Sequence, residues 1–184
     1  QAHYNLGVAL HEQEKFSESK KSFEKACQIK PNYFKAYLGI GNTLKEQGKV
    51  DAAIDNYKQA IKIKPDYAEA YNNMGIALKD KGEVDAAIDN YKQAIKIKPD
   101  YAEAYNNMGN TLQDKGDLDA AINSYKQAIK IKPEYADCFI NCDSILVQVS
   151  DASSLDVKLN PNANKRLKSL LCENPKHQIQ QSIQ

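Results

Sequence analysis

The sequence lacks any apolar run long enough to cross a membrane, and it has no excess of charge of either sign. Its apolar stretches fall well short of the roughly 20 residues that a membrane-spanning helix needs. It has 25 lysine and arginine residues against 24 aspartate and glutamate residues, so no basic excess predicts binding to nucleic acid or to a charged membrane surface. We therefore expect neither nucleic acid nor a membrane among its partners.

Cysteine is also scarce, and its placement is irregular. Cys27, Cys138, Cys142 and Cys172 do not show the spacing of a disulfide framework, which favours reduced, buried thiols in a cytoplasmic protein. Cys138 and Cys142 lie four residues apart on a predicted helix, as two metal ligands would. A structural zinc site needs four ligands, however, and no second pair is evident, so we expect packed thiols and no metal.

Residues and motifs typical of catalysis are few. His3, His11 and His177 are scattered, and the sequence has no Gly-rich phosphate loop, nucleophile elbow or His-Glu-x-x-His motif. Aspartates such as Asp51 and Asp55 recur beside lysines, which is typical of a solvated outer face and not of a pocket that perturbs carboxyl pKa values. We predict a protein without enzymatic activity and without a cofactor.

What the sequence does contain is a repeat of 34 residues. Pro31, Pro65, Pro99 and Pro133 mark the period, and the 26 letters from Val50 recur unchanged from Val84. A fixed period of this length is typical of stacked supersecondary units. Each unit buries its apolar face only against its neighbours, so the array exposes an extended surface.

The third repeat, 68–101, illustrates the first helix of a unit. Tyr71, Met74 and Leu78 follow the spacing of an amphipathic helix. Gly82 then stands where the end of a helix favours a residue that can adopt a positive φ. The first helix of the unit is therefore predicted to end at this glycine.

A second helix follows in the same repeat. We predict that Asp85 caps its start and that Pro99 ends it, because proline cannot donate a backbone hydrogen bond. Asp100 is a candidate cap for the next helix. Mid-helix Gly75 is expected to face Ala87 where the two helices approach closely, and Tyr91 and its equivalents at 57 and 125 are expected to pack between units. Each unit is thus an antiparallel helix pair.

These residues resemble the tetratricopeptide repeat. The family pattern is an aromatic residue, leucine-glycine, a large residue, alanine, an aromatic residue, alanine and proline. The third unit matches it with Tyr71, Met74, Gly75, Leu78, Ala87, Tyr91, Ala94 and Pro99. The resemblance implies an all-α fold, a right-handed α-solenoid of antiparallel helix pairs that winds into a superhelix.

The repeat divides the chain into units of unequal quality. The first is looser than the next three, with Glu14 where the turn glycine would stand. After Tyr135 the match weakens, and a degenerate fifth unit or cap is predicted, with a lengthened turn at 150–161. The chain begins at Gln1 inside a repeat, so we expect it to be part of a longer protein. The predicted segments are units at 1–33, 34–67, 68–101 and 102–135, the degenerate unit at 136–175, and a tail or further helix at 176–184.

The other face of each first helix points away from the core stripe, because a helix turns about 100° per residue. The resemblance implies that this face lines a concave groove in which ligands lie. An amide side chain offers both a donor and an acceptor, so a row of asparagines can hold the backbone of an extended peptide. The candidate groove residues are Asn5, Lys35, Asn42, Lys45, Glu69, Asn73, Ile76, Lys79, Glu103, Asn107, Asn110 and Asn141.

Two features qualify this prediction. Asn5, Asn73, Asn107 and Asn141 occupy the same place in their units and form what we call the asparagine row, which Gly39 interrupts. Asparagine could also recur at these positions without contacting a ligand. The row is similar to the one in the repeat region of O-GlcNAc transferase. Some members of the family clamp a terminal carboxylate with basic residues, but Glu69 and Glu103 would repel that group here.

We predict a non-catalytic scaffold that binds an extended peptide or partner segment in its groove. One alternative is the substrate-presenting region of a larger enzyme, such as a glycosyl- or sulfotransferase. Another is a structural scaffold that assembles with itself through its repeat ends.

Overall fold

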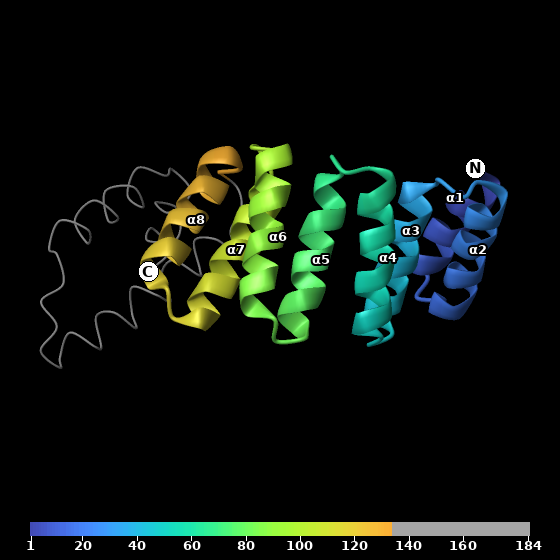
Figure 1. Cartoon of the computed structure of the whole chain (residues 1–184), viewed down its shortest axis with the longest axis horizontal. Coiled ribbons are helices and arrows are strands. Elements are labelled where there is room, and N and C mark those ends of the chain that lie inside the picture. Colours follow the sequence, from blue (N-terminus) through green and yellow to red (C-terminus); the bar gives the residue numbers. More distant parts are fainter. Residues whose placement is uncertain (134–184) are drawn as a thin grey trace, which may run out of the picture. The chain divides into compact units, whose positions relative to one another are not determined.

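The computed structural model describes residues 1–133, which form eight α-helices and no strand (Figure 1). The helices follow one another in a row, and each packs against the next along the chain. We call them the first to fourth pairs, each made of a first and a second helix. The pairs are α1 (Ala2–Glu12) with α2 (Phe16–Ile29), α3 (Phe34–Glu46) with α4 (Val50–Ile63), α5 (Ala68–Asp80) with α6 (Val84–Ile97), and α7 (Ala102–Lys115) with α8 (Leu118–Ile131).

The turn inside each pair has the same backbone geometry. In the third pair, Gly82 has a φ of 85°, and the Glu83 N–H donates to the Leu78 carbonyl at 2.9 Å. Glycine adopts this left-handed conformation without the steric cost that a Cβ brings. The prediction that Gly82 ends a first helix is confirmed. Glu14 adopts the same conformation in the first pair, with a φ of 58°.

The predicted helix caps are wrong in two places. Asp85 is the second residue of α6, and the residue that precedes the helix is Glu83. Asp100 lies one residue before Tyr101, which precedes α7. Glu83 and Tyr101, which stand directly before the two helices, make no side-chain cap hydrogen bond. The aspartates lie one or two positions away from these cap positions. Among the eight described helices, α8 alone has such a bond, in which the Ala120 N–H donates to Asp117 at 3.3 Å.

The core lies between the helices of each pair and between neighbouring pairs. Tyr57, Tyr91 and Tyr125 are the largest fully buried side chains among the described residues, as predicted from their place on the apolar stripe. Mid-helix Gly75 lies against Tyr91: a Cβ added there would be 2.6 Å from the Tyr91 ring, so the ring requires the glycine. The predicted approach of Gly75 to Ala87 stays a prediction.

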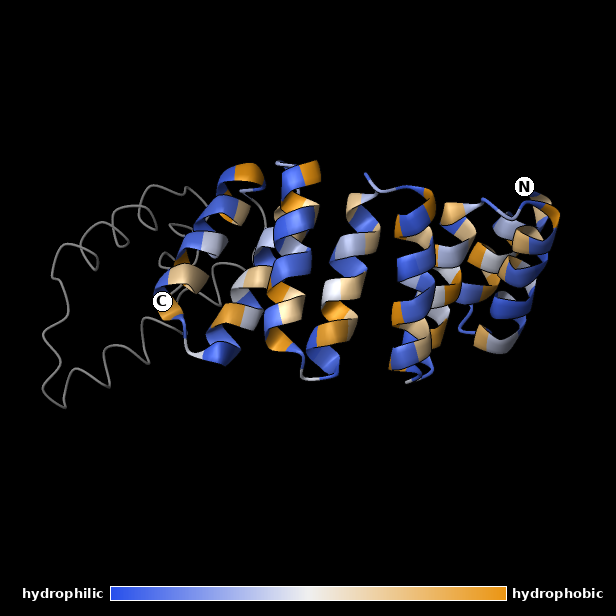
Figure 2. Cartoon of the chain, viewed as in Figure 1, coloured by the Kyte–Doolittle hydropathy of each residue, from blue (hydrophilic) through white to orange (hydrophobic). Residues whose placement is uncertain are grey.

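The aspartates of the second helices lie on a solvated face, as predicted. Figure 2 shows hydrophilic residues along the visible side of α4 and α6. Exposed Asp51 and Asp85 form ion pairs with lysines of the following pair, Lys81 at 2.9 Å and Lys115 at 2.6 Å. Within residues 1–133, no helix combines the length and apolar character that a membrane span requires.

The first helices occupy one side of the row. Helix α1 contacts α3, α3 contacts α5, and α5 contacts α7, whereas no second helix of the described residues contacts another second helix. The first helices are therefore packed more closely than the second helices. Their common surface, which we call the inner side, is where the predicted groove residues of the first helices fall.

Candidate functional site

Two of the predicted asparagines, Asn42 and Asn73, come together between the second and third pairs. The Asn73 Nδ2 of α5 donates to the Asn42 Oδ1 of α3 at 2.9 Å, and the Tyr57 hydroxyl donates to the same oxygen at 3.0 Å. Asn72, the neighbour of Asn73, donates to the Asn73 Oδ1 at 3.3 Å. The two amides are half-buried, and their orientations are held by the tyrosine and by each other.

A second cluster joins the third and fourth pairs. The Asn107 Nδ2 donates to the Oδ1 of Asn72 at 3.0 Å, and Asn72 is fully buried. Asn110 lies on the same helix, and the Tyr125 hydroxyl is 2.7 Å from its Oδ1. The asparagine row of the inner side is thus a hydrogen-bonded network that crosses from one pair to the next.

Ile76 changes this network in the third pair. It stands where Asn42 and Asn110 stand in the neighbouring pairs, and it offers no acceptor to the tyrosine beneath it. Burial raises the pKa of Tyr91 to about 12, and the nearby Thr111 of the next pair lowers it slightly. Ile76 is half-buried and packs against the core.

The gap in the asparagine row at Gly39 has a direct structural cause. A Cβ added at Gly39 would lie 2.6 Å from the Cζ of Phe23, whose ring is 2% exposed. Phe23 takes the place that Tyr57, Tyr91 and Tyr125 occupy in the other pairs, and it has no hydroxyl to bind an amide. The phenylalanine and the glycine therefore occur together.

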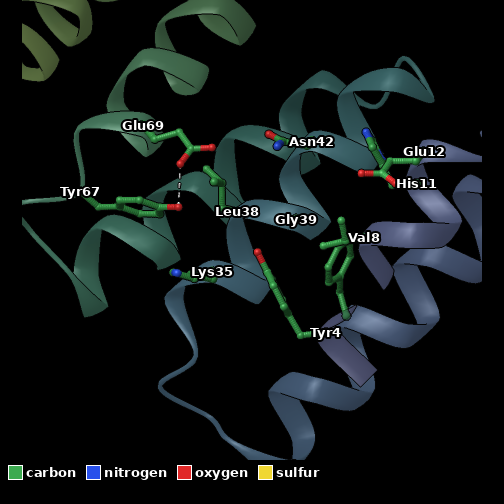
Figure 3. A pocket seen from close by; sticks show the side chains of 11 residues that line it. Tyr4, Val8, His11, Glu12, Lys35, Leu38, Gly39, Asn42, Tyr67 and Glu69 are labelled. Atoms are coloured by element: carbon green, nitrogen blue, oxygen red, sulfur yellow. Dashed lines mark hydrogen bonds between the residues drawn. The ribbon is translucent and has the colours of Figure 1, made fainter. Parts of the chain in front are cut away.

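A pocket of about 390 Å³ lies at this gap, between α1, α3 and the start of α5. Tyr4, Val8, Phe23, Leu38 and Gly39 form its apolar part. Figure 3 shows Lys35 and Glu69 at one end, His11 and Glu12 at the other, and Tyr4 between them. The polar residues that line it are His11, Glu12, Lys35, Asn42, Tyr67 and Glu69.

Hydrogen bonds fix several groups on the rim of this pocket. The Tyr67 hydroxyl donates to the Glu69 carboxylate at 2.9 Å (Figure 3). The His11 Nδ1 is 3.2 Å from the Thr43 hydroxyl. Burial raises the pKa of Tyr4, and the charges of Tyr33 and Glu69 raise it further. Glu12 has no hydrogen bond or ion pair with any described side chain.

Two of the three basic residues predicted for the groove are neutralised by carboxylates. Lys45 pairs with Glu46 at 3.0 Å, and Lys79 of the third pair reaches Asp114 of the fourth at 2.8 Å. Lys35 has no ion pair within residues 1–133. The inner side therefore presents little uncompensated positive charge.

The remaining predicted groove residues are not part of these clusters. Asn5 is exposed, and its Oδ1 accepts a hydrogen bond from the Gln1 side chain at 3.0 Å. Glu103 is exposed on α7. Asn141, Cys138, Cys142, Cys172 and His177 lie outside the described residues, as do the predicted degenerate unit and tail. Cys27 is a half-buried free thiol. No group of three or more potential metal ligands occurs within residues 1–133.

Three residues of this surface were not predicted from the sequence. Asn72 was not predicted to be buried, although the Asn-Asn doublet repeats at 106 and 107. Tyr4 and Phe23 were not assigned to the inner side, yet both line the pocket. The pocket could have been predicted from two departures from the repeat pattern that occur together: phenylalanine replaces tyrosine at position 23, and glycine replaces asparagine at position 39.

Comparison with known families agrees with this architecture. A tetratricopeptide repeat model matches residues 1–33 and 102–135, and a second model of the TPR repeat matches residues 41–82 and 76–116. The chain belongs to the tetratricopeptide repeat family. The family resemblance and the all-α solenoid predicted from the sequence are confirmed, and this fold is that of a protein-interaction scaffold. A search of curated proteins finds no match.

Solved structures of tetratricopeptide repeat proteins share the fold. MamA aligns with a TM-score of 0.65 at 24% identity, covering 80% of this chain and 96% of MamA. PilF of Pseudomonas aeruginosa gives 0.76 at 16% identity, with 83% and 69% covered. YrrB, described as having an unusual peptide-binding site, gives 0.66 at 24% identity, with 75% and 71% covered.

Proposed function

We propose that the inner side binds an extended segment of a partner protein, and that the chain acts without catalysis. The observation that carries this proposal is the hydrogen-bonded row of half-exposed amides on α3, α5 and α7. Such a row is suited to the peptide groups of an extended chain, whatever its side chains are.

The amides of this row retain unused hydrogen-bonding capacity. Asn42 uses its Oδ1 for Tyr57 and Asn73, and its Nδ2 has no partner among the described residues. Asn107 donates through its Nδ2 to Asn72, and its Oδ1 likewise has no described partner. An unused donor on α3 and an unused acceptor on α7 are thus available to different main-chain groups of one extended segment.

The network also reduces the cost of binding. Immobilising a side chain on binding costs about 0.5–1.5 kcal/mol. The amides of Asn42 and Asn73 are already oriented by Tyr57, because its hydroxyl anchors the oxygen that they share. A segment that binds them meets donors and acceptors already in place.

The charges of the inner side favour a main-chain contact over recognition of a terminal carboxylate. Lys45 and Lys79 are engaged with Glu46 and Asp114. Glu103 adds a negative charge on the same side. A free carboxylate there would meet more repulsion than attraction, so the proposed ligand is an internal segment of a partner.

The test is binding of fluorescein-labelled, unstructured 12-residue peptides to the chain and to the double variant Asn73→Ala/Asn107→Ala. Each lost hydrogen bond costs about 1 kcal/mol, so the double variant is expected to bind roughly 10- to 30-fold more weakly. The matched control is Asn56→Ala/Asn90→Ala. These asparagines are also 34 residues apart, but they lie on second helices and bond to the carbonyls of Ala52 and Ala86 at 2.8 Å.

Circular dichroism of each variant establishes that the helices are retained. Unchanged binding by the folded Asn73→Ala/Asn107→Ala variant would remove the amide row from the proposed contact surface. Equal weakening by both double variants would have the same consequence, because the control changes no residue of the inner side.

A further inference from the structure

The geometry points to an anchoring site in the pocket at Gly39, one that accepts an apolar side chain of the bound segment when a lysine or arginine lies next to it. This inference rests on the proposed function, because it places one residue of the same segment. It adds a sequence preference to an amide row that has little of its own.

The pocket is a built feature of the first two pairs. Gly39 has no side chain, and the space where one would begin is limited by the Phe23 ring, 2.6 Å from an added Cβ. Gly7 approaches the same ring, and a Cβ added there would lie 2.7 Å from its Cδ1 and Cε1. The Phe23 ring therefore closes the floor of the pocket, and Gly39, which also lines it, adds no side chain that would fill it.

The size and lining of the pocket suit an apolar side chain. Its volume of about 390 Å³ falls within the range of sites that bind small ligands. Tyr4, Val8 and Leu38 form apolar walls above Phe23. The asparagines that fill the same register on α5 and α7 are absent, so this is where an apolar group can approach the core of the repeat.

The rim of the pocket selects the neighbour of that side chain. Glu12 and Glu69 are two carboxylates, and Lys35 is a single ammonium group. Glu12 is exposed and has no described ion pair, and it lies at the end of the pocket away from Lys35 (Figure 3). The rim therefore carries an excess of one negative charge. A cationic side chain beside the apolar anchor would neutralise this excess, whereas an acidic side chain would be repelled.

The position of the pocket also gives the bound segment a direction. It lies between α1 and α3, whereas the amide row runs from Asn42 to Asn110 on α3, α5 and α7. A segment anchored at Gly39 extends along the amides toward α7. The anchor thus sets which residues of the segment lie on the amides, because hydrogen bonds to the main chain alone do not distinguish one register from another.

The test uses three labelled peptides of 12 residues, identical except at two central positions that hold Leu-Lys, Ala-Lys or Leu-Glu among serine, threonine and glutamine. Fluorescence anisotropy and methyl NMR of Val8 and Leu38 report binding to the full chain. The Leu-Lys peptide is expected to bind at least fivefold more tightly than the other two, and to shift the Val8 and Leu38 methyl signals.

Two variants locate the effect. Val8→Phe fills the pocket and is expected to bring the Leu-Lys peptide to the affinity of the Ala-Lys peptide. Ile76→Phe is the matched control at the same repeat position two pairs away: because it lies on the amide row and not in the pocket, it is expected to change the affinity of all three peptides alike and to leave the leucine preference intact. Exposed Glu12→Lys is expected to reverse the preference between Leu-Lys and Leu-Glu without disturbing the core.

The outcomes separate the two proposals. Equal affinity for all three peptides, with binding still lost in Asn73→Ala/Asn107→Ala, would overturn the anchor and leave the amide row in place. A leucine preference that survives Val8→Phe would also overturn it. A preference abolished by Val8→Phe, with binding unaffected by the asparagine variants, would support the anchor and contradict the amide row. No binding of any peptide would overturn both.

Discussion

Replacing Glu14 with glycine is expected to stabilise the first helix pair, because Glu14 has a φ of 58° and the equivalent turns use glycine. The turns are otherwise alike. The N–H that follows the left-handed residue donates to the last turn of the first helix at 2.9 Å in each case: Lys15 to Leu10, Lys49 to Leu44, Glu83 to Leu78 and Asp117 to Leu112. The side chain is therefore the difference to be tested.

The magnitude follows from two opposing terms. The left-handed conformation costs a residue with a Cβ roughly 1–2 kcal/mol. Glycine opposes this gain by about 0.4–1 kcal/mol, because it loses more conformational freedom when the chain folds. The net expectation for Glu14→Gly is a gain of about 0.5–1 kcal/mol in the free energy of unfolding. The Glu14 carboxylate has no hydrogen bond or ion pair with any described residue, so its removal costs no contact.

Hydrogen exchange of the α1 and α2 amides, measured by NMR, provides the assay, because each pair of a repeat array can open by itself. Protection is expected to rise about two- to fivefold, the factor that corresponds to 0.5–1 kcal/mol at room temperature. Gly82→Ala is the control of opposite sign. An added Cβ at Gly82 meets no atom within 4 Å, so only the backbone conformation is penalised.

Protection that is unchanged or reduced in Glu14→Gly, together with the expected loss in Gly82→Ala, would refute the reasoning. Such a result would mean that Glu14 makes a compensating interaction. If neither variant changed protection, the assigned cost of the left-handed turn itself would be wrong.

Two further predictions concern ionisable groups. Burial and the charge of Glu24 raise the pKa of Cys27 to about 11. Its alkylation by iodoacetamide at pH 8, followed by peptide mass spectrometry, is therefore expected to be on the order of 100-fold slower in the folded chain than in the urea-unfolded chain. Equal rates in the two states would contradict this prediction. The Lys115 ammonium lowers the pKa of Asp85, so this pair stabilises the fold above the unfolded carboxyl pKa and loses that contribution as pH falls through the folded one. Carbon-13 NMR titration is expected to show the Asp85 pKa rising in Lys115→Met and unchanged in Lys126→Met, and no rise in Lys115→Met would exclude the pairing.

The sequence predicted the features that depend on residues close together in the chain. Gly82 ends a helix because its own φ is positive, and α6 ends at Ile97, two residues before Pro99. The caps were less well predicted, because Asp85 lies only two positions from Glu83, which stands at the cap position. The ion-pair partner of Asp85, Lys115, lies 30 residues away, and no local pattern points to it.

The candidate site shows the same division. The asparagine row was predicted from its period, and the resemblance placed it on the inner side. Its internal bonding was not predicted. Whether Asn73 turns its Nδ2 to a ligand or to Asn42 depends on how two helices of different pairs approach. The period also revealed that Gly39 departs from the row, but not that a ring from α2 lies beneath it.

Tandem helix pairs follow from the sequence alone, because turn glycines, helix-ending prolines and the amphipathic period act over a few residues. Which amides bond to each other, and where the inner side opens into a pocket, depends on how the pairs pack. These bonds and this pocket depend on distances between residues of different helix pairs, such as Phe23 and Gly39. Such distances are set by how the pairs stack, so the repeat pattern alone does not predict them.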